Sequence, residues 1–440
     1  MDKFSFLNSA HTSFFAEMYD QYLESPDSLE PSWKAFFQGF DFGLESANIT
    51  VEEKKFEVPE NISKEFKVVN LIDAYRQRGH LFTITNPVRE RRKYSPTLEI
   101  ENFGLDKTDL NLVFSAGEVV GIGPDKLSNI IDHLQKIYCQ SIGLEYMYIR
   151  DPEKVKWIQS FINVNSNQPR FSKSEKLSIL DSLNKAYTFE NFLQKKYVGQ
   201  KRFSLEGGES LIPAIDFLIN SAAENGVEEF VMGMSHRGRL NTLANIFGKS
   251  SRDIFGEFEG KDYEEDIFDG DVKYHLGWTS ERTTSSGKKI NMNLAPNPSH
   301  LESVDPIVQG ITRAKLENNF DNNTNKVLPL IVHGDAAVAG QGVVYEVVQM
   351  SRLKGYSTGG TIHLIVNNQV GFTTNYLDAR SSTYCSDVGK VTLSPVIHVN
   401  SDDVEAVIHS VTFALEYRNK FNRDVFIDLL GYRKYGHNEG

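Results

Sequence analysis

The sequence has only two cysteines, Cys139 and Cys385, among its 440 residues. Two thiols cannot build a disulfide framework or a four-thiolate zinc site, and such sparing use is typical of a reducing compartment. The sequence also lacks a run of about 20 apolar residues, so we expect no membrane-spanning helix. Its first twenty residues have neither the basic start nor the unbroken apolar stretch of a secretory signal, and their acidic residues argue against a transit peptide. We therefore expect a cytoplasmic protein.

Positive charge is also scarce: the sequence has 47 Lys and Arg residues and 59 Asp and Glu residues, which gives a net charge of −12. An acidic excess repels phosphate backbones, which argues against nucleic acid as a partner. Any anionic ligand must be held by a local group of positive side chains or by a metal ion. The hydrophobic fraction of 40% and the charged fraction of 24% are ordinary for globular proteins. The length is sufficient for two or three domains.

The first 40 residues form an arm rich in aromatic side chains. Apolar residues between positions 9 and 23 recur with helical spacing, and a second aromatic cluster surrounds Trp33. A short helix near a terminus is only marginally stable alone, so its aromatic face must dock on something. The pattern leaves open whether that surface belongs to the same chain or to a partner.

The rest of the chain changes character twice. Residues 41–65 are acidic and polar without an apolar period, which is typical of a linker. Residues 66–200 follow mostly helical spacing, with helix N-caps expected at Asp151 and Ser172. From about residue 201 to residue 440, glycine becomes frequent and short β-branched runs alternate with helical segments.

This last region predicts an α/β fold. Apolar runs at 327–333, 361–368 and 424–432 read as strands. Between them lie helical patterns, one at 343–354 and one starting at Asp402 in a capping box with Glu405. Such alternation favours a doubly wound parallel sheet with right-handed crossovers and helices on both faces. Ligands of these sheets bind outside the carboxyl ends of the strands.

Two polar side chains follow neighbouring predicted strands. Asp335 closes the first strand, and Asn368 closes the next one. A carboxylate and a carboxamide surrounded by small residues suit Mg²⁺, which takes few protein ligands and completes its shell from a diphosphate and water. An acidic protein could bind a polyanion in this way. Asp and Asn at strand ends also cap turns and helices, so spacing alone leaves that reading open.

The stretch GDAAVAGQGV…NNQVGFTT resembles the thiamine diphosphate motif of E1 subunits of 2-oxoacid dehydrogenases. Further segments resemble the 2-oxoglutarate dehydrogenase E1 family. They are IDAYRQRGHL (72–81), FSLEGGESLIP (203–213), GMSHRGRLN (233–241), GDVKYHLGW (270–278), NPSHLE (297–302), LDARSSTYCSDVGK (377–390) and DVFIDLLGYRKYGHNEG (424–440). The resemblance covers most of the chain and is densest after residue 200. It implies an α/β domain of the thiamine diphosphate-binding type over residues 201–440.

The resemblance also implies roles for individual residues. Mg²⁺ would be bound by the side chains of Asp335 and Asn368 and by the main-chain carbonyl of Val370. The cofactor-binding residues that it implies are Arg237, Ser299, Leu301, Asp335, Ala336, Ala337 and Asn368.

Two histidines are the implied substrate and catalytic residues. His236 in HRGRL and His275 in KYHLG would recognise the carboxylates of 2-oxoglutarate, because imidazoles can donate hydrogen bonds and move protons near neutral pH. Thr279 occupies a position where relatives tend to have serine and keeps the hydroxyl, so it is a third substrate contact. Further pocket candidates are His300, His333 and His437, whose roles the sequence does not separate.

The function implied is thiamine diphosphate-dependent oxidative decarboxylation of 2-oxoglutarate in the tricarboxylic acid cycle. The succinyl group would pass to the lipoyl group of the E2 succinyltransferase, and the arm over residues 1–40 would dock on E2. We expect the intact enzyme to be a homodimer. The resemblance thus favours a partner for the arm.

The sequence ends at Gly440, directly after GHNEG, whereas family members continue through a second α/β domain that binds the aminopyrimidine ring. We therefore expect this chain alone to be inactive, unless a second chain completes the site. Two alternatives stay open. One is an E1-like decarboxylase or carboligase that acts without E2, and the other is a non-catalytic assembly module.

Overall fold

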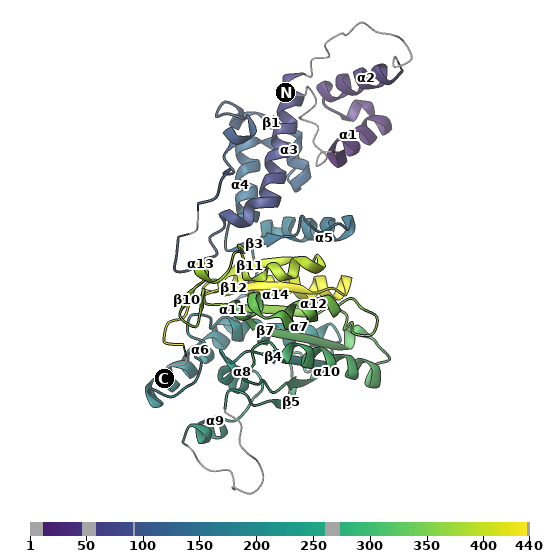
Figure 1. Ribbon diagram of the computed structural model, residues 1–440. Coiled ribbons are helices and arrows are strands. Elements are labelled where there is room, and N and C mark those ends of the chain that lie inside the picture. The colour runs from purple at the N-terminus through teal and green to yellow at the C-terminus, as the bar shows by residue number, and fades with distance from the viewer. Residues whose placement is uncertain (1–11, 46–58, 91–92, 260–272, 438–440) are drawn as a thin grey trace. The chain divides into compact units, whose positions relative to one another are not determined.

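The computed structural model describes residues 12–45, 59–90, 93–259 and 273–437. The chain divides into two compact units (Figure 1). Unit 1 comprises Met1–Phe82 and Arg92–Cys139, and unit 2 comprises Thr83–Arg91 and Gln140–Gly440. This division differs from the bounds expected at residues 65 and 200. Within the described ranges, every helix is too short or too polar to cross a membrane.

Unit 1 is mainly helical. Its longer helices are α1 (Thr12–Glu24), α2 (Pro31–Glu45), α3 (Glu60–Arg78) and α4 (Leu127–Tyr138), and the short strands β1 (Val113–Phe114) and β2 (Asp125–Lys126) pair antiparallel. Trp33 and Phe37 of α2 are fully buried, and the Trp33 ring lies 5.8 Å from that of Phe66 in α3. The aromatic face of the arm therefore packs on its own chain.

The structure differs from the expected linker over residues 41–65 at both of its ends. Residues 41–45 complete α2, and α3 begins at Glu60 directly after Pro59. Ile62 is fully buried, and the carboxylate of Glu65 accepts hydrogen bonds from the main-chain N–H groups of Ser115 and Ala116. The polar composition of this segment does not predict the first turns of α3, because the charged Glu65 is buried and hydrogen-bonded inside unit 1. Residues 46–58 lie outside the described part.

Unit 2 is built around one large sheet. In its described part the strand order is β3-β11-β12-β8-β7-β4-β6-β5. The strands are β3 (Ile142–Glu145), β4 (Glu229–Met234), β5 (Trp278–Thr283), β6 (Lys289–Leu294), β7 (Val327–Gly334), β8 (Ile362–Asn367), β11 (Val396–Asn400) and β12 (Val425–Leu430). The strands from β11 to β6 are parallel, and the edge strands β3 and β5 are antiparallel.

Helices cover both faces of this sheet. Helix α12 (Gly342–Met350) connects β7 to β8, and helix α14 (Val404–Phe421) connects β11 to β12. These two connections run in opposite directions along the strand order. Because both crossovers are right-handed, α12 and α14 lie on opposite faces of the sheet. Helix α10 (Val304–Asn319) packs on the α12 face through Val308 and Ile331, while α7 (Leu211–Glu224) packs against α14. The predicted doubly wound α/β fold is confirmed.

The remaining helices of unit 2 are shorter or lie at its margins. They are α5 (Pro152–Asn163), α6 (Lys173–Lys196), α8 (Arg239–Asn245), α9 (Ser251–Phe258), α11 (Asp335–Gly340), α13 (Tyr376–Ala379) and the 3-10 helix η10 (Cys385–Thr392). Asp151 and Ser172 cap α5 and α6 as predicted. The cap of α14 is Asp403 rather than Asp402, because Asp402 donates its N–H to Asn400 in a turn that precedes the helix.

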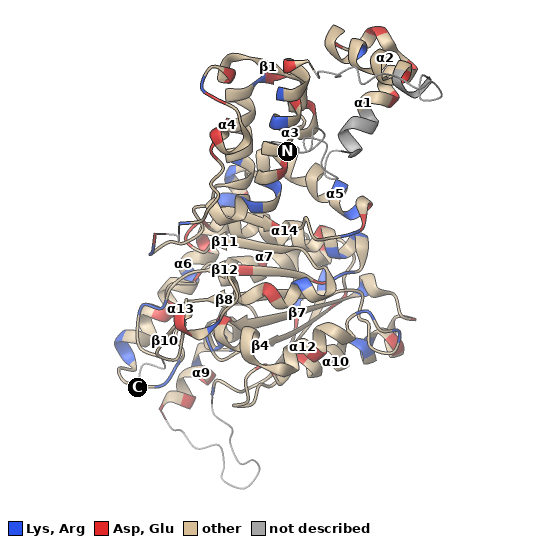
Figure 2. Cartoon of the chain, turned by 45° about the horizontal axis from the view of Figure 1, so that its top comes forward, with Lys and Arg blue, Asp and Glu red and all other residues tan. Residues whose placement is uncertain are grey.

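Charged residues lie mainly on helices and loops, and the strands of the large sheet carry few (Figure 2). Charges inside the strands are therefore exceptions. Glu145 of β3 and Asp428 of β12 are two such residues, and both are buried. A buried carboxylate is costly unless hydrogen bonds or opposite charges compensate it, so their partners indicate how the sheet edge is held.

Candidate functional site

The candidate residues lie at one edge of the large sheet. Because β4, β6, β7 and β8 are parallel, the segments that follow them emerge at the same edge. These segments begin with Ser235-His236, Ala295 to Asn297, Asp335 and Asn368. Strand β5 runs the opposite way, so His275, three residues before its start, also lies there. The fold therefore brings together the motifs on which the sequence analysis relied.

Asp335 lies at the first position of α11, directly after β7. The register pairs Gly334 with Val366, so Asp335 and Asn368 follow neighbouring strand ends. Asp335 is only 3% exposed, and its Oδ2 lies 3.4 Å from Nη1 of Arg380. Burial raises the pKa of Asp335 to about 6; Arg380 opposes this shift, and the nearby Asp428 adds to it. Arg380 lies in the motif 377–390, but no role was expected for it.

The chain after β8 turns back over α11. Gln369 has a φ of +64°, and Val370 N–H donates to Oδ1 of Asn368 at 3.2 Å. The short strands β9 (Val370–Gly371) and β10 (Thr374–Asn375) then form a hairpin. A Cβ on Gly371 would lie 2.7 Å from Cβ of Ala336, so the turn packs directly on the start of α11.

The donor atoms at this place fit a magnesium ion. They comprise the buried Asp335 carboxylate, the half-buried Asn368 carboxamide and the Val370 main-chain carbonyl. Hard oxygen ligands of this kind suit Mg²⁺, and the close approach of Gly371 to Ala336 keeps the two ligand-bearing segments together. The exposed Ala336 and the buried Ala337 border the same place. These residues are therefore candidates to hold a diphosphate-bound metal.

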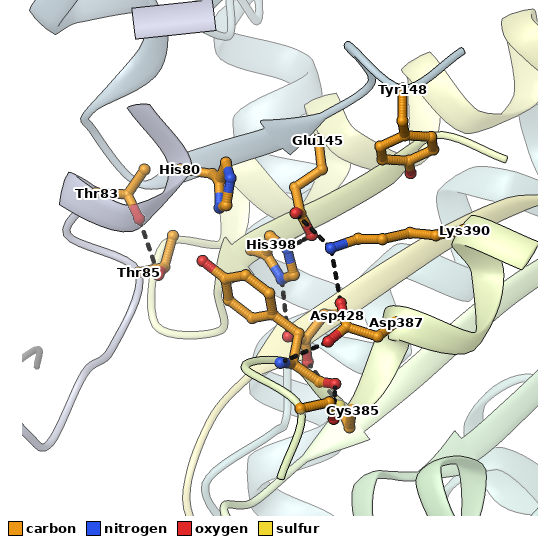
Figure 3. Close-up of polar contacts among 12 residues, drawn as sticks. His80, Thr83, Thr85, Glu145, Tyr148, Cys385, Asp387, Lys390, His398 and Asp428 are labelled. Atoms are coloured by element: carbon orange, nitrogen blue, oxygen red, sulfur yellow. Dashed lines mark hydrogen bonds and ion pairs between the residues drawn. The ribbon is translucent and has the colours of Figure 1, made fainter. Parts of the chain in front are cut away.

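A row of buried polar groups crosses the sheet from Asp428 of β12 through His398 to Glu145 of β3 (Figure 3). Asn367 Nδ2 donates to Asp428 Oδ1 at 2.8 Å, and Asp428 Oδ2 lies 2.9 Å from His398 Nδ1. His398 Nε2 lies 3.0 Å from Glu145 Oε1, whose other oxygen accepts from Lys390 at 2.6 Å. Asn367 is thus used inside the sheet, which leaves Asn368 as the carboxamide at the edge.

Opposing effects act on His398 in this row. Its complete burial favours the neutral ring, but the hydrogen bonds to Asp428 and Glu145 outweigh burial and raise the pKa of His398. A cationic His398 and Lys390 compensate the two carboxylates. The row therefore joins β3, β11 and β12 to η10 through paired charges.

His236 and His275 form a buried pair. Their Nε2 atoms lie 3.1 Å apart, and the side chains are 9% and 6% exposed. Nδ2 of Asn297 lies 3.0 Å from Nδ1 of His236, and the main-chain N–H of Asn297 donates to the carbonyl of His275. The hydroxyl of Ser299 lies 3.5 Å from His275 Nε2. The structure thus brings together two predicted histidines and one predicted cofactor contact.

Arg239 holds the segments that carry this pair. Its fully buried guanidinium donates to the main-chain carbonyls of Met234, Leu276 and Ala295, at the ends of β4 and β6 and before β5. Burial lowers the pKa of Arg239 to about 10, so it stays charged at neutral pH. No role was expected for Arg239 or Asn297, although both lie in the quoted motifs at 233–241 and 297–302. Their position inside HRGRL and NPSHLE is the one feature of the sequence that could have indicated a functional role for them.

The structure also describes the other predicted residues, Arg237, Leu301 and Thr279. The Arg237 guanidinium donates to the carbonyls of Ser204 and His437. Leu301 is 43% exposed. Thr279 lies on β5 and lines a groove of about 430 Å³ together with Trp278, Asn293, Leu294, Pro296 and Ile311.

The structure separates the three further histidines. His300 is exposed, and the His437 ring lies 4.7 Å from that of Phe372. His333 is fully buried, with Nδ1 2.6 Å from Glu302 Oε2 and Nε2 2.9 Å from His363 Nδ1. Glu302, Asp305 and His333 could be read as metal ligands. However, two ligands on a tetrahedral zinc ion stand about 3.3 Å apart, so the 2.6 Å separation is a hydrogen bond.

Comparisons with known proteins bear on this site. Residues 182–440 match the family described as "Dehydrogenase E1 component", and residues 4–44 match "2-oxoglutarate dehydrogenase N-terminus". The chain is 42% identical to the 2-oxoglutarate dehydrogenase E1 component of Azotobacter vinelandii, over 98% of this chain and 49% of that protein. It is 41% identical to the mitochondrial 2-oxoglutarate dehydrogenase of Dictyostelium discoideum, over 99% of this chain and 46% of that protein.

A third relative has a different name. The chain is 48% identical to the multifunctional 2-oxoglutarate metabolism enzyme of Mycolicibacterium vanbaalenii, over 87% of this chain and 31% of that protein. The chain therefore spans less than half the length of each of these relatives. The predicted site residues described above lie within residues 182–440, the range that matches the E1 family.

Proposed function

Because this chain belongs to the dehydrogenase E1 component family, we propose that it is part of a thiamine diphosphate-dependent E1 that acts on 2-oxoglutarate. The names of the relatives support the substrate, and the match at residues 4–44 supports the 2-oxoglutarate type. The observation that carries the proposal is the buried Asp335 at the end of β7, beside a turn that presents Asn368 and Val370.

In this proposal, the site at β7 and β8 holds thiamine diphosphate and Mg²⁺. Thiamine diphosphate, when bound, supplies the electron sink that decarboxylation of a 2-oxoacid requires. Asp335, Asn368 and the carbonyl of Val370 bind the metal. The cofactor contacts are Arg237, Ser299, Leu301, Ala336 and Ala337. Arg237 and the metal then supply the local positive charge that a chain of net charge −12 needs to bind an anion.

His236 and His275 bind the substrate. They are largely shielded from water, and Ser299 lies within 3.5 Å of His275, so the histidine pair borders a residue assigned to the cofactor. Hydrogen bonds from imidazole N–H groups to a carboxylate are strong in such an environment. Thr279 remains the third candidate for a substrate contact.

The complete enzyme would pass the succinyl group to the lipoyl group of E2, assemble as a homodimer and work in the cytoplasm. The arm over residues 1–40 would dock on E2. Its buried rings, Trp33 and Phe37, pack inside unit 1, whereas Leu23 and Phe40 are 60% and 37% exposed. Docking would therefore use the exposed apolar side chains of the arm.

Titration of this chain with thiamine diphosphate, with and without Mg²⁺, tests the cofactor site. Asp335→Ala removes the charged ligand, so we expect the Mg²⁺-dependent affinity to fall tenfold or more. Asp321→Ala removes an exposed carboxylate elsewhere in unit 2 and serves as the matched control. Binding that does not need Mg²⁺, or that Asp335→Ala leaves unchanged, would contradict the proposal and favour a non-catalytic assembly module.

A deletion separates the E2-dependent enzyme from a decarboxylase that works without E2. Removal of residues 1–40 from the complete enzyme should abolish NADH production coupled to the complex and leave decarboxylation with an artificial electron acceptor intact. If complex-coupled NADH production survives the deletion, the arm is not the E2-docking element.

A further inference from the structure

Asn297 contacts both members of the histidine pair. Its main-chain N–H donates to the His275 carbonyl at 2.9 Å, and its Nδ2 lies 3.0 Å from His236 Nδ1. The side chain is 2% exposed and stands between Pro296 and Pro298, whose fixed φ angles restrict the backbone on both sides. A single rigid residue therefore fixes the position of one histidine and the hydrogen-bonding state of the other.

The orientation of the Asn297 amide determines where the protons of the pair lie. An amide nitrogen only donates, so His236 Nδ1 must accept and carry no proton. A neutral His236 then carries its proton on Nε2 and donates to His275 Nε2 at 3.1 Å. His275 in turn carries its proton on Nδ1. Both rings are neutral in this arrangement, and the shared hydrogen bond points from His236 to His275.

The opposite orientation of the amide would satisfy no more groups. Asn297 Oδ1 is buried without a hydrogen-bond partner, and Nδ2 uses one hydrogen toward His236. If the amide were turned over, Oδ1 would accept from His236 Nδ1–H, and both hydrogens of Nδ2 would lack acceptors. The structure places Nδ2 toward His236 at 3.0 Å, and the tautomer of His236 distinguishes the two orientations.

Aromatic rings pack around the pair. The Tyr274 ring lies 5.5 Å from the His236 ring and 5.3 Å from the His275 ring, and Phe203 lies 5.1 Å from His236. Two arginines contact the same segments. Arg239 reaches the His275 carbonyl, and the neighbouring Arg237 donates to the carbonyl of His437, whose ring packs on Phe203. These contacts hold the backbone on both sides of the pair.

We propose that Asn297 is a positioning residue that holds the neutral His236 in its Nε2–H tautomer, so that the pair offers a donor to a substrate carboxylate. A carboxylate that enters the pair takes the place of His275 Nε2 as the acceptor. His236 then binds an anion at neutral pH without first gaining a proton. This inference rests on the proposed function, because that function supplies the dicarboxylate substrate.

The tautomers can be measured in this chain without any activity. In a protein labelled with ¹⁵N-histidine, the ring shifts of His236 should show a protonated Nε2 and an unprotonated Nδ1, with assignment from His236→Gln and His275→Gln. Asn297→Asp has the same shape but only accepts hydrogen bonds, so Nδ1 of His236 should become protonated. A wild-type His236 that is protonated on Nδ1 would overturn the proposal.

The complete enzyme provides the functional test. We expect the wild-type KM for 2-oxoglutarate to be nearly constant from pH 7 to pH 9. In Asn297→Asp, His236 loses its Nε2 proton as pH rises, so KM should increase about tenfold or more across this range. The effect on kcat should be smaller, because the change acts on substrate binding.

Asn325→Asp is the matched control, because it adds the same charge at an exposed position before β7, far along the strand from the site. A KM–pH profile of Asn297→Asp that matches this control would overturn the proposal.

A second variant covers the case in which Asn297→Asp does not fold. Asn297→Ala should show both neutral tautomers of His236, and the Nε2–H tautomer alone would contradict the proposal. Should the wild-type enzyme not turn over 2-oxoglutarate, the proposed function fails while the tautomer result still stands.

Discussion

Fully buried arginines hold the loops of unit 2 in place. Arg239 donates to carbonyls at the ends of two strands, and Arg418 donates to the carbonyls of Gly360, Thr324 and Val327. Arg202 instead pairs with the buried carboxylates of Glu190 and Glu206. Main-chain carbonyls beyond a strand end have no ladder partner, and the several donors of a guanidinium satisfy them at once.

A half-buried histidine provides a test at the residue scale. Burial lowers the pKa of His409 to about 4, and its Nε2 lies 3.2 Å from Asn167 Oδ1. The folded state therefore keeps His409 neutral, while the unfolded chain takes up a proton below pH 6.5. The resulting stability is complete above pH 6.5 and is lost as pH falls toward 4. Between pH 7.5 and 5 this amounts to about 2 kcal/mol.

His409→Gln keeps a neutral donor toward Asn167 and cannot gain a proton. Its free energy of unfolding, from urea titrations at several pH values, should therefore fall less than that of the wild type between pH 7.5 and 5. His300→Gln changes an exposed histidine and should keep the wild-type pH dependence. Parallel curves for His409→Gln and the wild type would show that His409 is not buried as a neutral group.

At the scale of elements, the turn after β8 packs against the first residues of α11. Asn368 and Val370 come from the turn, and Asp335 and Ala336 come from the helix. Their alignment depends on two small residues, since only hydrogen at Gly371 permits the observed approach to Ala336. The same backbone positions with larger side chains would move one ligand-bearing segment away from the other.

This packing predicts a rescue experiment. Gly371→Ala would place two Cβ atoms 2.7 Å apart, which forces the turn from α11, so Mg²⁺-dependent binding of thiamine diphosphate should weaken about tenfold or more. Adding Ala336→Gly removes the opposing Cβ and should restore most of the affinity. Ala336→Gly alone is the control. If the double variant binds as weakly as Gly371→Ala, the contact is not what aligns the ligands.

At the scale of the whole molecule, the proposed cofactor site belongs to one compact unit. Asp335, Asn368, His236 and His275 all lie in unit 2, whereas α3 and α4 lie in unit 1. A ligand stabilises only the structure that opens when the ligand is released. The division into units therefore determines how far the effect of the cofactor extends.

Hydrogen exchange measures this extent. At 100 times the dissociation constant, a ligand adds about 2.7 kcal/mol to the stability of the unit that binds it. With Mg²⁺ and thiamine diphosphate we expect slower exchange in β7, α11 and β8, and unchanged exchange in α3 and α4. Asp335→Ala should remove the protection. Equal protection in α3 and β7 would mean that the two units open together.

Local patterns predicted much of unit 2. The apolar runs and helical periods between residues 327 and 432 indicated β7, α12, β8, α14 and β12, because buried parallel strands and amphipathic helices leave strong signals over a few residues. The start of α3 before residue 66 was not predicted. Its buried Glu65 accepts a hydrogen bond from the main chain of Ser115, 50 residues away, and local patterns do not show such a contact. Strands β3, β4, β5, β6 and β11 of the large sheet were also missed. Their place in the sheet follows from pairing with distant segments.

The sequence by itself determined the fold class, the family resemblance and the motif residues, because these depend on residue types at short spacings. It could not show that Asn297 joins His236 to His275, or that Arg239 binds three separate chain segments. It named Asn368 as the ligand, but it could not show that Asn367 turns into the sheet toward Asp428. Such roles depend on contacts between residues far apart in the chain, which exist only once the sheet has assembled.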